Sequence, residues 1–172
     1  EQSINARLAA LLRAQEVILQ SDGASAGLRS LLERALEPFD LSRIAITEGP
    51  LVQVESDVAV GLGLLFHELA TNALKYGALS VPQGRILIEW SVEAGLARVL
   101  WREVDGPPVT APRNKGFGGR LLDVALVPQG GKAARRFEPG GLVCELLIPS
   151  PSGQAAAEPP GAAFVRAGSG VA

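Results

Sequence analysis

The sequence contains no methionine and only one cysteine and one histidine, and these scarcities narrow the classes of protein it can represent. A single cysteine, Cys144, cannot form an internal disulfide, which excludes a disulfide-stapled secreted domain and favours a reducing cytoplasm. No stretch approaches the roughly 20 apolar residues of a membrane-spanning helix, and no signal segment begins the chain. Because the chain starts at Glu1 and lacks methionine, we expect it to be an excerpt of a longer protein.

The chain also lacks a strong net charge. Its 16 basic and 18 acidic residues give a formal charge of -2. We therefore expect no overall attraction to nucleic acid or to an anionic membrane, and any phosphate binding must rest on a local group of residues. The 172 residues, 47% of them apolar, suffice for one domain with a single buried core.

Helical spacing of apolar residues predicts three helices before the middle of the chain. The first covers residues 3–20, and the second runs from a cap at Ser25 to Pro38. The third is longer. It starts at a cap formed by Ser56 or Asp57 and runs to about Tyr76, where a glycine closes it.

Strand patterns occur in pairs. Residues 44–46 and 51–54 are predicted to be joined across the turn Glu48-Gly49-Pro50, and two later hairpins are predicted for residues 85–92 with 96–103 and 133–138 with 142–148. Between these hairpins, residues 105–119 are rich in proline and glycine and predict a mobile loop that leads into a helix over 120–127. This order of elements predicts an α+β sandwich with a largely antiparallel sheet.

The long central helix carries the polar residues that suggest chemistry. Glu68, Asn72 and Lys75 stand at i, i+4 and i+7, so they line one stripe beside the apolar face of that helix. Taken alone, three such residues are ordinarily a solvated face. Because the rest of this helix is apolar, we expect them to be partly buried, and a nucleotide with its metal would supply the partners they need.

Residues 66–80, Phe-His-Glu-Leu-Ala-Thr-Asn-Ala-Leu-Lys-Tyr-Gly-Ala-Leu-Ser, resemble the N box of the superfamily that includes DNA gyrase, a heat-shock chaperone, MutL and histidine kinases. They are most similar to the HWE group of sensor histidine kinases, named for a His in this box and a later Trp-x-Glu. His67 and Trp101-Arg102-Glu103 supply both parts of that name. The similarity continues in order through 106–109, 116–122 and 140–144, and covers roughly residues 5–149.

The resemblance implies a two-layer α/β sandwich of the histidine-kinase ATPase (Bergerat) type, with a mostly antiparallel mixed sheet and helices on one face. Residues 1–22 would be a remnant of the dimerisation and phosphotransfer helix, 23–149 the ATP-binding catalytic domain, and 150–172 a disordered tail rich in alanine, glycine and proline. The domain would transfer the γ-phosphoryl group of ATP to a histidine on a separate helix, for relay to the receiver domain of a response regulator. A homodimer through the upstream hairpin is a further expectation.

The resemblance also implies roles for individual residues. Asn72 would ligate Mg²⁺ at the nucleotide phosphates, and Lys75 would meet phosphate oxygens as a point charge. Glu68 would activate or orient the attacking imidazole, or hold metal-bound water. Glu103 would accept a hydrogen bond from the adenine amine, which an acceptor-only carboxylate distinguishes from guanine's carbonyl.

The loop after Glu103 would form a short lid over the phosphates, with Arg113 as a further cationic contact. Its glycines would let the backbone approach the nucleotide, and the amides that begin the next helix would face the phosphates. The nucleotide-binding residues implied here are Gly106, Lys115, Gly116, Gly118, Gly119 and Arg120.

Two departures from the family pattern bear on function. The first of two glycines that usually precede the Pro-Pro pair is Asp105 here, which could narrow the adenine pocket or add charge near it. The upstream His-Arg-x-x-Asn segment that carries the phosphoacceptor has no match in this chain, and the usual histidine of the following stretch is Gln15.

His67 is assigned to the catalytic group as a positioning residue, because an imidazole beside a carboxylate, here Glu68, more often positions a reacting group than receives a phosphoryl group. The competing readings are a phosphorylated residue and a hydrogen-bonded core histidine. For the whole domain, two other functions remain open at this point: a nucleotide-binding regulatory module without kinase activity, and an ATP hydrolase.

Overall fold

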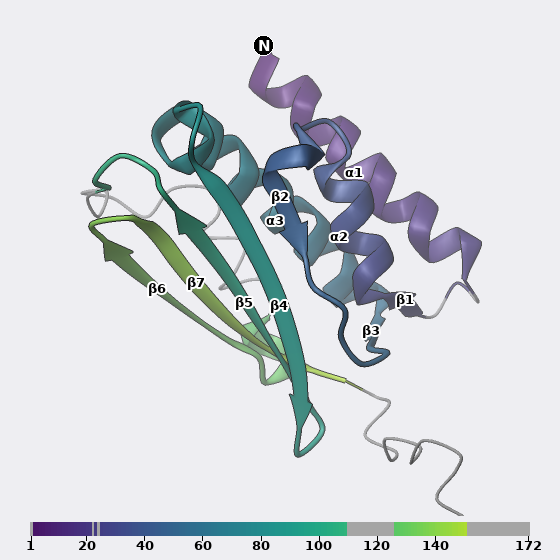
Figure 1. Ribbon diagram of the computed structural model, residues 1–172. Helices are drawn as coiled ribbons and strands as arrows, with labels where there is room; N and C mark the ends of the chain where they lie inside the picture. The colour runs from purple at the N-terminus through teal and green to yellow at the C-terminus, as the bar shows by residue number, and fades with distance from the viewer. Residues whose placement is uncertain (1, 22, 24, 110–125, 151–172) are drawn as a thin grey trace, which may run out of the picture.

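The structure is a computed structural model that describes residues 2–21, 23, 25–109 and 126–150. Figure 1 shows its helices packed together on one face of a twisted sheet. The α-helices are α1 (Gln2–Gln20), α2 (Leu28–Leu36) and α3 (Ser56–Tyr76). Short 3-10 turns are η1 (Leu41–Arg43), η2 (Ala78–Ser80) and η3 (Val127–Gln129). These helices and the sheet confirm the predicted two-layer α+β sandwich.

The main sheet has five strands in the order β2-β4-β5-β7-β6. The strands of this sheet are β2 (Ile44–Ile46), β4 (Arg85–Glu93), β5 (Leu96–Val104), β6 (Lys132–Glu138) and β7 (Gly141–Pro149). Only the short β2 runs parallel to its neighbour, β4, and the other pairs are antiparallel. Both late hairpins are therefore confirmed, as is the mostly antiparallel mixed sheet.

The predicted hairpin between residues 44–46 and 51–54 is wrong. β2 pairs with β4 instead, whereas β3 (Gln53–Glu55) pairs with β1 (Ser25–Gly27) in a separate two-stranded sheet beside the helices. The connecting loop does not turn back because the indole of Trp90 holds it. The Trp90 Nε1 donates to the Pro50 carbonyl at 2.9 Å, and a Cβ on Gly49 would lie 2.6 Å from the Trp90 ring.

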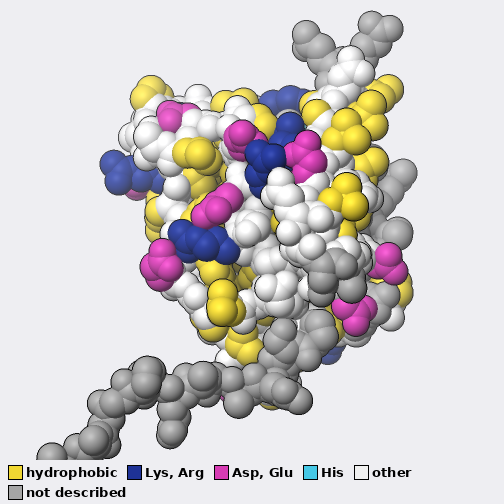
Figure 2. All heavy atoms as spheres, turned by 90° about the vertical axis from the view of Figure 1, so that its right-hand side faces the viewer, with side chains coloured by type: hydrophobic (Ala, Val, Ile, Leu, Met, Phe, Trp, Pro, Cys, Tyr) yellow, Lys and Arg dark blue, Asp and Glu magenta, His cyan; other side chains and the backbone are white. Residues whose placement is uncertain are grey.

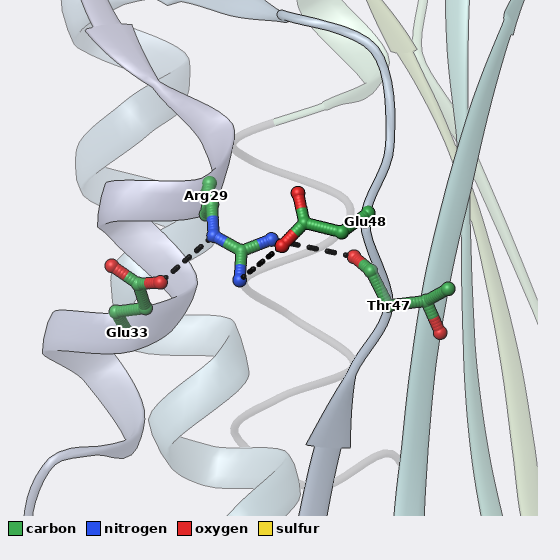
Figure 3. A network of polar contacts seen from close by, with 4 residues as sticks. All are labelled: Arg29, Glu33, Thr47 and Glu48. Atoms are coloured by element: carbon green, nitrogen blue, oxygen red, sulfur yellow. Dashed lines mark hydrogen bonds and ion pairs between the residues drawn. The ribbon is translucent and has the colours of Figure 1, made fainter.

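The same loop is tied to the helical layer by Arg29 of α2 (Figure 3). Its Nε lies 2.9 Å from a Glu33 oxygen, and its other nitrogens lie 3.4 Å from Glu48 and from the Thr47 carbonyl. These groups are largely exposed, so each contact stabilises the fold by no more than about 1 kcal/mol. Their effect is to direct the chain from the sheet toward the helices.

Two predicted helix caps are also wrong. Ser25 belongs to β1, and α2 begins after Gly27, since the chain there must first pair with β3. Ser56 is the first residue of α3 rather than its cap, and its hydroxyl donates to the Gly23 carbonyl at 3.3 Å. In both cases a long-range contact replaces the expected local one.

The core lies between the inward face of the sheet and the apolar side of α3. Side chains alternate along β4 and β5, so that every second residue is buried on the inward face, except at the end of β4, where Val92 is exposed. The largest members of this core, each at most 2% exposed, include Phe66, Leu62, Leu69, Ile88 and Trp101. A fully buried Leu or Phe side chain contributes about 1.5–3 kcal/mol to stability, so this contact dominates the fold.

Helix α1 packs closely on α3, because Gly63 has no side chain. A Cβ at that position would lie 2.8 Å from the Cβ of Ala14. On its other side α1 exposes an apolar stripe made of Ile4, Leu8, Leu12 and Leu19, each more than half exposed. Figure 2 looks onto this side of the molecule and shows hydrophobic side chains at its surface.

The division of the chain at residues 22 and 149 stays a prediction. Helix α1 shares the helical layer with α2 and α3. Ser150, which we placed in the tail, is buried and donates from its backbone to Gly95 and from its hydroxyl to Gln53. The folded part therefore includes Ser150, and the remainder of the predicted tail lies outside the described residues.

None of the helices in the described ranges combines the length and hydrophobicity that crossing a bilayer requires.

The buried thiol of Cys144 provides a test of the packing. Burial raises the pKa of Cys144 to about 11, and its side chain lies on the inward face of β7 opposite Arg135. At pH 8 only about one thiol in a thousand would be ionised. We expect a thiol-reactive dye to label the folded chain at pH 8 far more slowly than the urea-unfolded chain. Equal rates would contradict this packing.

Candidate functional site

The candidate site lies where α3 ends beside the end of β5. Helix α3 stops at Gly77, whose N–H donates to the carbonyls of Ala73 at 3.0 Å and Asn72 at 3.2 Å. The chain then turns through η2 toward β4. Of the predicted site residues, Asn72 and Lys75 stand on the last turns of α3, and Glu103 is the penultimate residue of β5.

Asn72 and Lys75 are exposed, whereas the sequence pattern predicted that they are partly buried. Within the described part of the chain, neither side chain has a hydrogen bond or an ion pair. Both can therefore meet a ligand without first breaking an internal contact. An amide oxygen and an ammonium group offer one metal ligand and one phosphate contact.

Glu68, the third residue of the predicted stripe, is only 8% exposed and is paired with α1. The Nε of Arg7 lies 2.8 Å from Glu68 Oε1, and its Nη2 lies 3.4 Å from Oε2. A buried carboxylate needs such a partner. Arg7 thus links the first helix of the chain to the residue predicted to act on the attacking group, and nothing in the local sequence pattern around Arg7 signals this contact.

Glu103 lies inside the protein, with 4% of its surface exposed. Its Oε2 accepts a hydrogen bond from the backbone N–H of Ala78 at 2.8 Å. Burial raises the pKa of Glu103, and the hydrogen bond from Ala78 acts in the opposite direction. The carboxylate therefore joins the end of β5 to the turn that follows α3.

Three glycines allow the backbone to approach this carboxylate and its partner. A Cβ on Gly77 would lie 2.0 Å from Glu103 Oε2, and one on Gly141 would lie 2.6 Å from the Glu103 Cβ. A Cβ on Gly106, a residue predicted to bind nucleotide, would lie 2.7 Å from the Ala78 Cα. Gly106 thus has a packing role here, and its contact with nucleotide stays a prediction.

Asp105 adopts φ of 55°, in the left-handed region that favours glycine. Its side chain is exposed. The glycine expected from the family pattern would fit this backbone better, and aspartate is among the residues that tolerate it. At Asp105, the departure from the family pattern therefore affects the backbone conformation and adds a carboxylate at an exposed position.

His67 faces the helical layer. Its ring lies 5.3 Å from that of Phe39, centroid to centroid, and its Nδ1 is buried without a hydrogen-bond partner in the described part of the chain. Burial lowers the pKa of His67, and the nearby positive charge of Arg13 adds to this effect. These contacts fit a histidine of the core, and the catalytic role of His67 stays a prediction.

Arg43 was not singled out by the sequence, and it makes the densest set of contacts at this site. Its guanidinium donates to four carbonyls of the segment after α3, those of Ala78, Leu79, Val81 and Gly84. The segment around Arg43 has no motif or periodicity that would have identified it.

The remaining predicted residues lie outside the described residues: Lys115, Gly116, Gly118, Gly119, Arg120 and the lid residue Arg113. Across the described ranges, no group of three or more His, Cys, Asp or Glu side chains is placed to hold a metal ion. The residues present fit a cation held largely by other ligands. One amide oxygen, from Asn72, suits Mg²⁺ when phosphate oxygens and water complete its octahedral shell.

Comparison with known proteins finds histidine kinases that are similar to this chain in sequence and in structure. No family model matches the chain. It is 38% identical over 151 residues to a blue-light-activated histidine kinase of Brucella ovis, a match that covers 83% of this chain and 31% of that protein. The protein of the same name from Brucella anthropi is 39% identical over 151 residues, with 30% of its length covered. The chain thus spans about a third of these relatives.

Solved structures share the fold. The histidine kinase domain of the Erythrobacter litoralis blue-light activated histidine kinase superposes with a TM-score of 0.68 at 22% identity, over 86% of this chain and 74% of that one. The ATP binding domain of PrrB from Mycobacterium tuberculosis gives a TM-score of 0.58 at 20% identity, over 74% and 97%. At these identities the likeness shows the fold alone.

The raised pKa of Glu103 predicts how stability depends on pH. The folded protein holds this proton to a higher pH than the unfolded chain, whose carboxyl has the ordinary value of 4.5. The free energy of unfolding should therefore fall as the pH rises from about 4.5 through the folded pKa. Glu103→Gln should not show this decrease, so its free energy of unfolding relative to that of wild type should increase over the same pH range.

Urea unfolding of the two proteins between pH 4 and pH 8 measures the difference. Glu55→Gln, which replaces an exposed carboxylate, is the matched control. Parallel profiles for wild type and Glu103→Gln would show that burial does not raise this pKa.

Proposed function

Because the chain belongs to the histidine kinase family, we propose that it is the ATP-binding catalytic domain of an HWE-type sensor kinase, which transfers the γ-phosphoryl group of ATP to a histidine outside these 172 residues. The observation that carries the proposal is the juxtaposition at the end of α3. A buried carboxylate, Glu103, stands on one side of the α3–η2 corner, and the exposed amide and ammonium groups of Asn72 and Lys75 stand on α3 itself. One nucleotide could contact all three groups.

The base would be recognised by Glu103. A carboxylate accepts hydrogen bonds and donates none, so it can accept from the amine of adenine and repels the carbonyl that guanine presents there. Its burial strengthens this discrimination, because a polar group left unpaired in the interior costs about 1–3 kcal/mol. The bond from Ala78 fixes one of its oxygens and thereby orients the group.

The phosphates would lie toward Asn72 and Lys75. Asn72 would hold Mg²⁺ through its amide oxygen, and Lys75 would contact phosphate oxygens. When bound, Mg²⁺ would neutralise charge on the phosphates that the acceptor must approach. The protein contributes position and charge here, which is what phosphoryl transfer chiefly requires.

Glu68 would orient the acceptor imidazole. Its carboxylate is close to the surface of α1 and is held there by Arg7 at 2.8 Å. The apolar stripe of Ile4, Leu8, Leu12 and Leu19 on the same helix suits a second helix of a phosphotransfer hairpin, and such a hairpin could also form a homodimer. A response regulator receiver domain would then take the phosphoryl group from the histidine, in the cytoplasm.

The proposal is tested by incubating γ-labelled ATP and Mg²⁺ with this chain and with the longer protein that includes its acceptor histidine. We expect acid-labile label on the longer protein only, because the sole imidazole of this chain, His67, is packed against Phe39 in the helical layer. Free phosphate without labelled protein would indicate a hydrolase. Neither product would indicate a nucleotide-binding regulatory module, and label on the short chain would contradict the role given to His67.

Asn72→Ala should remove most of the magnesium dependence of ATP binding while leaving the fold intact. The side chain is exposed and has no described partner, so little stability should be lost. Removing one ligand to the metal should weaken binding in Mg²⁺ by about ten- to a hundredfold.

Titration calorimetry with ATP, with and without Mg²⁺, measures the effect of Asn72→Ala. Asn5→Ala, which removes an exposed amide from α1, is the control. Unchanged magnesium dependence would show that Asn72 is not the metal ligand.

A further inference from the structure

Arg43 lies at the end of η1, one residue before the sheet begins at β2. Its Nε and Nη2 lie 3.0 and 2.7 Å from the Gly84 carbonyl, its Nη1 lies 3.3 Å from that of Leu79, and its Nη2 lies 3.1 Å from that of Ala78. The Val81 carbonyl also accepts from Nη2. A single side chain from a distant part of the sequence thus binds four carbonyls of the turn between α3 and β4.

Only arginine can make this set of bonds. Guanidinium has five N–H donors in a rigid planar fork, whereas the ammonium of lysine is a point charge with three donors on a flexible stem. The backbone of the turn is packed closely enough to present its carbonyls to this fork. Gly84 approaches so closely that a Cβ there would lie 1.9 Å from the Ala78 oxygen, so a side chain would displace the carbonyl that Arg43 binds.

Ala78 connects this network to the buried carboxylate. Its carbonyl accepts from Arg43, and its N–H donates to Glu103 Oε2 at 2.8 Å. The Cα of Ala78 is also in close contact with Gly106, which leaves the residue little room to shift. The position of Ala78 therefore helps to fix which way the Glu103 carboxylate is rotated, together with the backbone of Leu142, which also donates to it.

We propose that Arg43 is a positioning residue for nucleotide specificity. By holding Ala78, it keeps one oxygen of Glu103 engaged and sets the direction in which the other oxygen meets the base. Arg43 makes its described contacts with backbone carbonyls and acts through Ala78. This inference rests on the proposed function of Glu103 as the acceptor of the adenine amine.

A purely structural role for Arg43 would have a different signature. If the guanidinium only stabilised the turn, its loss would lower the thermal midpoint and weaken ATP and GTP binding by the same factor. If it orients Glu103, its loss should reduce the preference for ATP over GTP. The ratio of the two dissociation constants therefore separates the roles.

The experiment compares wild type, Arg43→Lys, Glu103→Gln and the double variant of this chain, with dissociation constants for Mg-ATP and Mg-GTP and thermal midpoints for each. Glu103→Gln should lower the ATP preference by about ten- to a hundredfold, and Arg43→Lys by roughly three- to tenfold. The double variant should show no lower preference than Glu103→Gln alone, because Arg43 then has no carboxylate to orient. The control is Arg34→Lys, because Arg34 pairs with the surface residues Glu16 and Glu37.

The outcomes separate the two hypotheses. If Glu103→Gln leaves the preference for ATP over GTP unchanged, both the adenine role of Glu103 and the inference on Arg43 are overturned. If the preference for ATP falls in Glu103→Gln but not in Arg43→Lys, the inference on Arg43 alone is overturned. The same holds if the effects of the two substitutions multiply in the double variant.

A second variant covers the case in which Arg43→Lys does not fold. Asp40 caps η1, accepting from the Ser42 N–H at 3.1 Å and from its hydroxyl at 2.6 Å, so Asp40→Ala loosens the turn that aims Arg43. A lower ATP preference in Asp40→Ala supports the inference, and the wild-type preference overturns it.

Discussion

The hydrogen bond between the Ala78 amide and the buried Glu103 carboxylate is the contact on which the candidate site depends. It joins the sheet to the helical layer at the point where both elements end. A carboxylate inside a protein is unfavourable unless donors surround it, so the backbone must remain close, and the glycines at 77 and 141 make this approach sterically possible. The bond therefore connects the end of β5 to the end of α3.

In this arrangement, the buried part of α3 and its exposed last turns have different roles. The buried part of the helix, from Leu62 to Leu69, is anchored on the sheet and on α1 by its apolar side chains. The last turns carry Asn72 and Lys75 into solvent. A rigid helix that changes from buried to exposed along its length can hold polar side chains steady without occupying their hydrogen-bonding groups, which is the condition for binding a charged ligand.

Much of the fold followed from the sequence because its signals are local. Alternation marked the two hairpins of the sheet, helical spacing marked α1 and α3, and the motif around Asn72 identified the helix that carries the site. The errors share one physical cause. β2 and β3 looked like a hairpin because they are close in sequence, but the partner of β2 is β4, some 40 residues later in register, with Ile44 opposite Ile86. Arg43 contacts residues 35 to 41 positions away and Arg7 a residue 61 positions away, and contacts between such distant residues produce no periodic pattern in the sequence.

The order of the strands also bears on how the protein avoids self-association. An exposed sheet edge is a template for pairing with another chain, and the described sheet ends in β2 on one side and β6 on the other. β2 offers only three residues, Ile44–Ile46, which is too short for a stable new pairing. β6 is longer but carries the charged side chains of Lys132, Arg136 and Glu138 at exposed positions, and charged side chains on an edge strand disfavour pairing with another chain. The edges of the described sheet thus keep its backbone hydrogen-bonding groups from recruiting a permanent neighbour, and leave association to the side-chain surfaces of the domain.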